Sequence, residues 1–259
     1  MNKNKGNYHT QGRGKKMRKN SISYDSFKWR HLIWGIIFSF LLVPIASSLL
    51  AEILFTSGKW LLPGIDGLSA YALDRLQTAA ISLFQMLGAC LFLLFYGPMK
   101  KLIRPVLSLK PLRMKKTYLL IFGLMIATYL MGFLIDYFFP SSAKDQLNEL
   151  SLAQVWDMHP GLIILTFLAT SLFVPIYEEF IFRGVILTFF QSKYSYLTSS
   201  ILSSLLFGIA HFYSLGVVIS AFFAGLLLSY LFKKTGSITP GILFHMVNNA
   251  AVLFLSQYL

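Results

Sequence analysis

The sequence predicts an all-α protein, a polytopic transmembrane helical bundle of about seven spans, with eight as the alternative. Two features of its composition lead to this fold class. Of the 259 residues, 56% are hydrophobic and only 13% are charged, whereas soluble domains average roughly 25% charged residues. The apolar residues also gather in runs of about 20, the length that crosses a bilayer as a helix. No hydrophilic stretch between them is long enough for a second soluble domain.

Seven apolar runs meet this length criterion. They lie at about 31–54, 77–96, 118–139, 161–191, 196–213, 215–232 and 238–257. The fourth run is longer than one span requires and contains Pro175, which predicts a kink or a break. Only the sequence YSLG separates the fifth run from the sixth, so these helices should form an antiparallel hairpin. The polar segment 140–158 has room for a short interfacial helix.

The loops differ in charge, and this difference predicts the orientation in the membrane. Segment 1–30 holds nine Lys and Arg residues and segment 97–117 holds seven, and the turns at 192–195 and 233–237 are basic too. The alternate loops are mixed or acidic. Because basic loops stay cytoplasmic, seven spans with a cytoplasmic N-terminus satisfy every loop. A break at Pro175 would place Lys233 and Lys234 outside, so one long, kinked fourth helix is favoured.

The same features bear on partners and localisation. A basic tail can bind nucleic acid, but this one precedes an apolar helix, so topology and anionic lipid explain it better, and no nucleic-acid partner is expected. Cys90 is the single cysteine, which excludes an intrachain disulfide. No cleavable signal peptide is evident before the first run. The tail is rich in Lys and Asn and the loops are compact, which is typical of bacterial proteins. We therefore expect an integral protein of a bacterial cell membrane.

A small set of polar side chains falls inside the predicted spans. An ionisable residue there costs about 2.5–3.5 kcal/mol on insertion scales and is by default a functional-site hypothesis. At about 1.5 Å per residue, three helices bring such groups to a depth of roughly 16–22 Å from the predicted cytoplasmic boundary. Asp136, near the outer end of the third span, is interpreted as interfacial. The set comprises Glu178, Glu179, Arg183, His211, His245, Asn248 and Asn249.

Spacing within the fourth helix separates the roles of its charged residues. Glu179 and Arg183 are four residues apart and share one face, so an ion pair is expected there. A structural role is favoured for this pair, because a paired charge in a low-dielectric bundle mainly positions its neighbours. Glu178 points about 100° away from Glu179. It is therefore the carboxylate left free for chemistry.

The two histidines lie on later helices. His245 and Asn249 are four residues apart and can address one ligand together, whereas Asn248 has the poorer spacing. Phe207 lies one turn before His211 and is expected to wall the site. A single membrane histidine is often a helix–helix hydrogen-bond donor. Two of them at the depth of a free carboxylate favour a functional site instead.

This set of side chains suggests hydrolysis. A carboxylate with an imidazole can take a proton from water, and a second histidine with an amide can donate to an oxyanion. Glu178, His211 and His245 are also a zinc ligand set, although no H-E-x-x-H motif selects that metal. No G-x-S-x-G elbow indicates a serine nucleophile. The three side chains thus agree both with acid–base hydrolysis without a metal and with a zinc site.

Three motifs carry a resemblance to a known family. EEFIFR, FGIAH and HMVNN match E-E-x-x-x-R, F-x-x-x-H and H-x-x-x-N. In this order on successive helices they resemble the CAAX protease and bacteriocin-processing (Abi) family of intramembrane endopeptidases, which includes the type II CAAX prenyl endopeptidase. Each motif alone is weak, and the ordered set is specific. The resemblance covers about 118–257 and leaves 1–30 as a basic cytoplasmic tail and 31–117 as N-terminal transmembrane helices outside the shared core.

The resemblance implies a role for each motif position. Glu178 and His211 would activate the water, and His245 and Asn249 would stabilise the oxyanion. No cofactor is expected, because a metal-free glutamate mechanism is the favoured view of the family, and zinc is the alternative. The substrate would be a peptide or membrane-protein precursor that enters a cavity open to the membrane, as in bacteriocin or pheromone processing or self-immunity.

The resemblance also gives Glu179 and Arg183 the role of holding the helix geometry.

A non-catalytic membrane scaffold or immunity protein that binds a partner membrane protein is the alternative function. Such a scaffold could lose Glu178 or His211 without cost, whereas this chain keeps every motif residue. A transporter would show repeat symmetry, and the sequence shows none.

Overall fold

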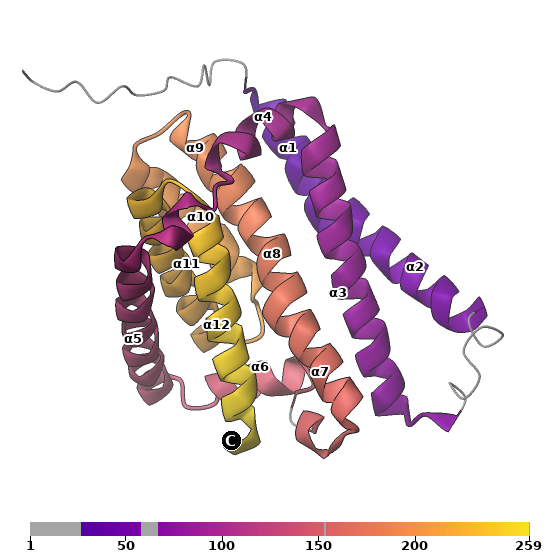
Figure 1. The fold of residues 1–259 in the computed structure, drawn as a ribbon. Helices are drawn as coiled ribbons and strands as arrows, with labels where there is room; N and C mark the ends of the chain where they lie inside the picture. Colours follow the sequence, from indigo (N-terminus) through magenta and orange to yellow (C-terminus); the bar gives the residue numbers. More distant parts are fainter. Residues whose placement is uncertain (1–26, 58–66, 153, 259) are drawn as a thin grey trace, which may run out of the picture.

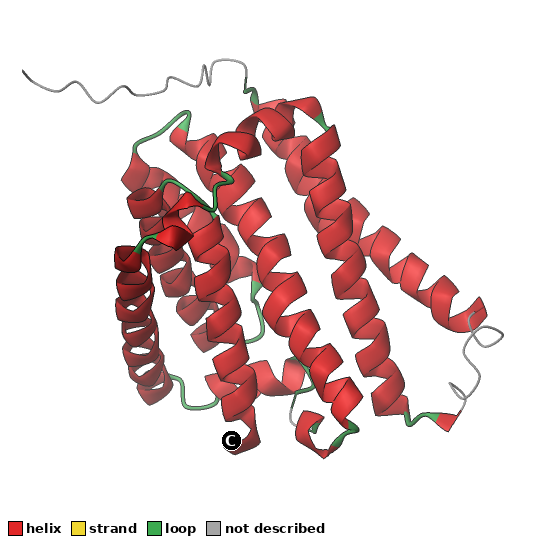
Figure 2. Ribbon diagram, in the orientation of Figure 1, coloured by secondary structure: helices red, strands yellow, loops and turns green. Residues whose placement is uncertain are grey.

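The structure, a computed structural model, describes residues 27–57, 67–152 and 154–258, and over these ranges every regular element is a helix (Figures 1 and 2). Most of the basic tail, up to residue 26, lies outside the described residues. Six of the described helices are long and apolar enough to cross a membrane, and Tyr196–Ala210 is a shorter apolar helix. These seven helices match the seven predicted runs, and the polytopic helical bundle is confirmed.

The first two long helices form one side of the bundle (Figure 1). The first of them comprises α1 (Trp29–Ile37), a π-helical stretch (Phe38–Leu42) and α2 (Val43–Ser57). It packs along α3 (Ala70–Phe95), which in turn contacts the fourth long helix. The Ser69 side chain caps α3 by accepting from the backbone N–H of Ala72. This helix therefore begins before the predicted run at 77–96 and includes Asp74 and Arg75.

The fourth long helix is continuous over 32 residues, Pro160–Gln191. It comprises α7 (Pro160–Leu168), α8 (Val174–Glu179) and α9 (Thr188–Gln191), joined by π-helical turns at Ala169–Phe173 and Phe180–Leu187. Pro175 lies two residues after the end of the first π-helical turn, and such turns accommodate an interrupted hydrogen-bond ladder. The helix is thus not broken at the proline, and the alternative with an eighth span does not form.

The next two helices form the predicted antiparallel hairpin. They are α10 (Tyr196–Ala210) and α11 (Leu215–Thr235), and they pack closely along their length. Gly208 permits this approach, because a Cβ atom there would lie 2.8 Å from the backbone oxygen of Val218. The sequence predicted that the helix would run to 213, but α10 ends at Ala210. His211 follows it in a non-helical conformation, with φ −105° and ψ 41°.

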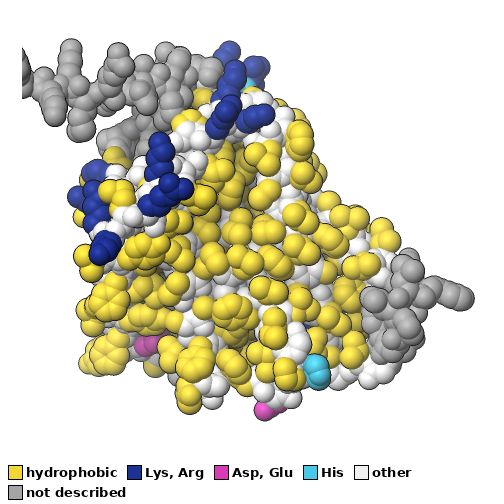
Figure 3. All heavy atoms as spheres, in the orientation of Figure 1, with side chains coloured by type: hydrophobic (Ala, Val, Ile, Leu, Met, Phe, Trp, Pro, Cys, Tyr) yellow, Lys and Arg dark blue, Asp and Glu magenta, His cyan; other side chains and the backbone are white. Residues whose placement is uncertain are grey.

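The remaining helices complete the bundle around the fourth. α5 (Lys115–Phe138) packs on α11, and α12 (Thr239–Leu255) packs on α8 and on the π-helical turn Ala169–Phe173. α4 (Gly97–Ile103) follows α3 and contacts the end of the fourth long helix. Ser237 donates to the backbone oxygen of Ser108 at 2.8 Å, so the loops before α5 and before α12 meet at one end. Figure 3 shows Lys and Arg side chains gathered at that end.

A short helix, α6 (Ser142–Glu149), lies within the segment where the sequence left room for one. It sits at the end of the bundle opposite the basic loops (Figure 1). Two side chains of α3 hold the residues that follow it: the Tyr71 hydroxyl donates to Ser151 O at 2.5 Å, and Arg75 Nη1 donates to Leu150 O at 2.8 Å. An apolar cluster joins it to the end of α12, formed by Leu147, Leu152, Val155 and Leu253.

The close approach at Gly208 leads to a stability prediction. Gly208→Ala is expected to lower the thermal unfolding midpoint in detergent, because the backbone of α11 cannot yield and overpacking costs about 1–3 kcal/mol. Gly123→Ala on α5 is the matched control, because its Cβ would meet nothing within 4 Å. Alanine favours a helix over glycine by up to about 1 kcal/mol, so this control should unfold no earlier than the parent. Equal midpoints for both variants would contradict the packing.

Candidate active site

Three side chains that the sequence placed at similar depth lie together in the structure. Glu178 of α8 has one carboxylate oxygen 3.8 Å from Nε2 of His211 and the other 3.6 Å from Nε2 of His245. The side chains are 16%, 17% and 8% exposed, respectively. These separations are longer than hydrogen bonds. The carboxylate therefore faces both imidazoles without a direct hydrogen bond to either.

The second glutamate, Glu179, contacts the His245 imidazole on the side that faces away from Glu178. Glu179 is completely buried, and its Oε1 lies 2.8 Å from Nη1 of Arg183 and 3.3 Å from Nδ1 of His245. The predicted ion pair is thus present. Glu179 also contacts His245, so this histidine spans both glutamates, one with each ring nitrogen. Gly241, one turn before His245, allows α12 to approach, since a Cβ there would lie 2.9 Å from Oε2 of Glu179.

Phe207 lies at the centre of the cluster rather than only at its wall. The guanidinium carbon of Arg183 lies 4.4 Å from the centroid of this ring. The ring is also 4.5 Å from that of His211 and 5.8 Å from that of His245. A cation over an aromatic face is attracted by about 0.5–2 kcal/mol, most strongly when the pair is desolvated. Phe207 is buried and therefore positions Arg183 and both histidines.

The ring nitrogens that face away from Glu178 have acceptors as partners. Nδ1 of His211 lies 2.8 Å from the backbone oxygen of Phe207, and Nδ1 of His245 faces the Glu179 carboxylate. Because carbonyl and carboxylate oxygens only accept, each Nδ1 is assigned the proton. In the neutral imidazoles, both Nε2 atoms then present lone pairs toward an acidic side chain. A bridging water, an extra proton or a cation would relieve this gathering of acceptors.

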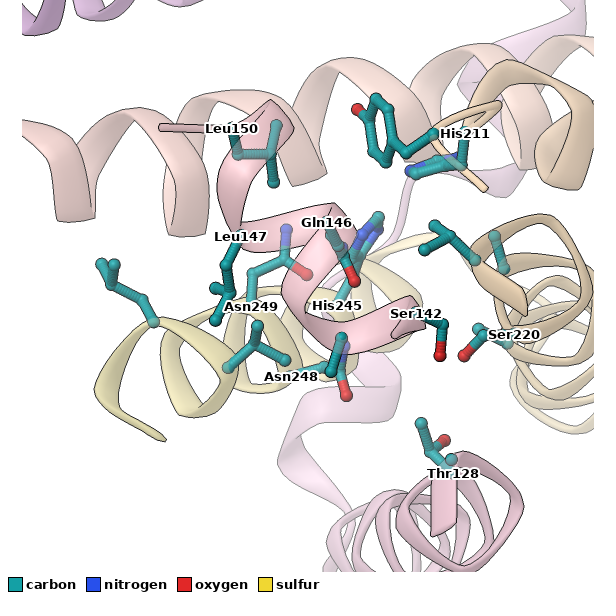
Figure 4. A pocket seen from close by; sticks show the side chains of 18 of the residues that line it. Thr128, Ser142, Gln146, Leu147, Leu150, His211, Ser220, His245, Asn248 and Asn249 are labelled. Carbon is teal, nitrogen blue, oxygen red and sulfur yellow. The ribbon is translucent and has the colours of Figure 1, made fainter. Parts of the chain in front are cut away.

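The two asparagines take different positions on α12. Asn249 donates from Nδ2 to the backbone oxygen of Thr170 at 3.0 Å and lines the same cavity as His245. One of its two amide hydrogens remains for another acceptor. Asn248 also lines the cavity, farther from the fourth helix in Figure 4. Both therefore lie at the site, and the spacing preference for Asn249 agrees with its contact to the helix that carries Glu178.

A cavity of about 350 Å³ adjoins the cluster. Glu178, Phe207, His211 and His245 line its inner end, and residues of α5, α6, α11, α12 and the part of the fourth helix before Glu178 line most of the rest. Figure 4 shows α6 crossing over it, with Gln146 among the lining side chains. Asp136 also lines it and accepts from the Ser142 hydroxyl at 2.6 Å. It is exposed, as the interfacial interpretation expected.

Comparison with known proteins addresses the segment that carries this cluster. The family model for type II CAAX prenyl endopeptidase, Rce1-like, matches residues 160–251. Residues 160–251 are thus similar to this Rce1-like family. The segment runs from the start of α7 into the last turns of α12 and holds all three motifs. It therefore has the fold of a CAAX-type intramembrane protease within an integral membrane protein, and the resemblance seen in the sequence is confirmed.

The other comparisons are narrower. An uncharacterized 24.3 kDa protein of Escherichia coli is 33% identical over 88 residues, which are 32% of this chain and 41% of that protein. The chain thus matches less than half the length of this curated relative. No solved structure matches. The Rce1-like match begins at residue 160, so the wider shared core at 118–257, the tail 1–30 and the helical segment 31–117 stay predictions.

Some features of the site were missing from the sequence analysis. The contact between Glu179 and His245 joins residues 66 positions apart, and no spacing rule within one helix indicates it. Gln146 and Gly241 carried no signal either, because α6 and α12 meet the site only in the folded bundle. The hub position of Phe207 had a weak signal, its distance of one helical turn from His211.

The buried ion pair leads to a second stability prediction. Glu179→Gln and Arg183→Met should each destabilise the protein by about 3–5 kcal/mol, because each leaves an uncompensated buried charge. The double variant should lose clearly less than the sum, since neither charge then remains. Denaturant-induced unfolding in mixed micelles measures this cycle. Arg113→Met, at an exposed position, is the matched control and should stay within about 0.5 kcal/mol of the parent. Additive losses would contradict the pairing.

Proposed function

We propose that the protein is an intramembrane endopeptidase that hydrolyses a peptide bond in a peptide or membrane-protein precursor. One observation carries this proposal: Glu178 lies between the Nε2 atoms of His211 and His245 at the inner end of a cavity among membrane-spanning helices. The family of residues 160–251 supports the reaction class. Processing of a bacteriocin or pheromone precursor, or self-immunity, is the expected biological setting.

The geometry supports roles for the two groups that face the gap. A water between Glu178 and His211 would donate to both, because both present acceptors to it. The water oxygen attacks the scissile carbonyl carbon and forms the C–O bond, while Glu178 takes a proton from this water. The proton then moves to the amide nitrogen as the C–N bond breaks, which releases the amine. His211 holds the water through Nε2, while the carbonyl of Phe207 fixes its tautomer.

The opposite side of the cavity would hold the oxyanion. Asn249 has one amide hydrogen beyond the bond to Thr170 O, and it can donate to a developing negative charge. His245 donates there only when Nε2 carries a proton as well, and the Glu179 carboxylate at Nδ1 would stabilise that cation. In a serine protease, removal of one oxyanion donor costs about 2.7–4 kcal/mol of transition-state stabilisation.

A metal would use the same three side chains. Two imidazoles and a carboxylate are zinc ligands by type, and each Nδ1 has an acceptor behind it, as metal-bound histidines do. However, no group of three His, Cys, Asp or Glu residues in the described part of the chain is arranged to hold an ion. We therefore assign the steps to the side chains alone and propose zinc only as the alternative.

Substitution at the gap tests the proposal. Glu178→Gln and His211→Ala should each reduce peptide cleavage by about 10²-fold or more, the range that general acid–base groups contribute. Cleavage of a mixed peptide library by purified protein in detergent, read by mass spectrometry, measures this. Glu52→Gln removes a carboxylate near the outer end of α2 and should leave the rate unchanged. Equal products from all four proteins would favour the scaffold over the enzyme.

The metal alternative has a separate test. A metal-free mechanism predicts that prolonged dialysis against a strong chelator leaves the cleavage rate unchanged, and that added zinc does not raise it. Metal analysis of the dialysed protein shows that the treatment worked. Loss of activity that zinc restores would overturn the metal-free proposal and assign Glu178, His211 and His245 as ligands.

A further inference from the structure

The charged side chains outside the site are divided between the two ends of the bundle. Counted over the described residues, one end carries twelve Lys and Arg residues and no carboxylate. The opposite end carries six carboxylates and two basic residues. The first group comprises Lys28, Arg30, Lys100, Lys101, Arg104, Lys110, Arg113, Lys115, Lys116, Lys193, Lys233 and Lys234. The second comprises Glu52, Asp74, Arg75, Asp136, Lys144, Asp145, Glu149 and Asp157.

Contacts between distant segments show that each group belongs to one end. At the basic end, the Trp29 ring packs edge-on against Phe189, and the Lys233 ammonium lies 4.0 Å from the centre of the Tyr196 ring. The serine pair at 108 and 237 joins two further loops there. At the acidic end, α6 and the residues after it contact α3, α11 and α12. The same division is visible on the face drawn in Figure 3.

The cavity extends from the catalytic cluster toward the acidic end only. From α5 it is lined by residues between Thr128 and Asp136, which form the half of that helix nearest α6. From α11 it is lined between Val217 and Leu228, and from α12 between Phe244 and Leu255. On the fourth helix, Glu178 is the last lining residue. Every helix thus contributes the part that lies between the cluster and α6.

The basic side of the cluster is closed. All residues from Glu179 to Phe190 are buried, and most of them belong to the largest apolar core cluster, together with Ile103 and Ile238. A second apolar cluster, which includes Leu231 and Phe244, fills the space between α5, α11 and α12. A substrate could not reach Glu178 from the basic end without disrupting this packing. The substrate has room only beneath α6 or beside α6, between α5 and α12. Tyr129 and Asp136 are exposed there.

We propose that this cavity takes its substrate from the extracytoplasmic side of the membrane. Basic loops remain in the cytoplasm, so the closed end faces inward and α6 faces outward. This inference rests on the proposed function and deepens it. The substrate is then an exported peptide, or the extracytoplasmic part of a membrane protein, rather than the terminus of a cytoplasmic protein.

The lining also defines the charge of the substrate. Among the described residues, no Lys or Arg side chain lines the cavity, whereas Asp136 and Glu178 do. A cavity with low-dielectric walls and charges of one sign raises the local concentration of the opposite sign. The site thus suits an internal peptide segment that is neutral or cationic. A free C-terminal carboxylate is disfavoured near Asp136.

Cysteine accessibility in intact cells tests the direction of access without any need for activity. Cys90 is the one native cysteine, so Cys90→Ser gives a background for single new cysteines in the full chain. Ser220→Cys reports on the cavity wall, Asn148→Cys on the exposed face of α6, and Thr198→Cys on the basic end. The reagent is a membrane-impermeant maleimide, applied to intact cells and to permeabilised cells.

The expected result is labelling of Ser220→Cys and Asn148→Cys in intact cells, and of Thr198→Cys only after permeabilisation. Reaction of each purified variant with a small permeant maleimide in denaturant shows that the thiol is present, and detergent gel filtration shows that the variant is folded. Labelling of Ser220→Cys from the same side as Thr198→Cys would overturn the proposal. So would a Ser220→Cys that neither side reaches, because the cavity would then be closed to water.

A second arm tests the charge of the cavity. For each variant, the rate with a cationic methanethiosulfonate is divided by the rate with an anionic one of similar size. This ratio should be at least about threefold higher for Ser220→Cys than for Asn148→Cys. Asp136→Asn should reduce that preference. An anionic reagent that reacts as fast as the cationic one would overturn the charge assignment. Because Glu178→Gln can abolish cleavage without changing the side of labelling, failure of the function and failure of the access direction give different results.

Discussion

The Glu179 carboxylate is the point on which the rest of the site depends. It is fully buried, and it meets Arg183 on its own helix and His245 on α12. A buried carboxylate without such partners would be costly in a membrane protein. The same contacts fix the orientation of His245, which turns its other nitrogen toward Glu178. The Glu179–His245 contact therefore joins α8 to α12, and the ion pair with Arg183 holds the carboxylate that makes this contact.

The sequence was sufficient to predict the bundle, because lipid leaves few alternatives to apolar helices. The fourth helix was predicted almost to the residue, and its continuity through Pro175 followed from the charges at Lys233 and Lys234. The limits of other helices were less predictable. α3 begins earlier than predicted, because Arg75 is held by Leu150 O and Asp74 and so tolerates a helix. No proline or glycine follows Ala210 directly, so the sequence gives no clear sign that α10 ends there.

The composition of the site was predictable for a related reason. Ionisable side chains are rare at membrane depth, so Glu178, His211 and His245 stood out, and helical rise brought them to one level. The cross-helix contact to Glu179 was not predictable, because it depends on how α12 rotates against α8. The family match ends at residue 251 and begins at 160, so α5 and α6, which wall the cavity, lie outside it. The family match therefore says nothing about these two walls of the cavity.

The anchoring of α6 has an energetic consequence for any opening of the cavity. The segment after it is tied to α3 by bonds from Tyr71 and Arg75, so it cannot swing aside as a free loop. Breaking two such hydrogen bonds costs about 2–4 kcal/mol. An open form at that cost would make up roughly 0.1–3% of the molecules at equilibrium. A substrate that required this open form would bind with its apparent affinity lowered by the same fraction. The residues of α3 that set this population lie far along the chain from all three motifs.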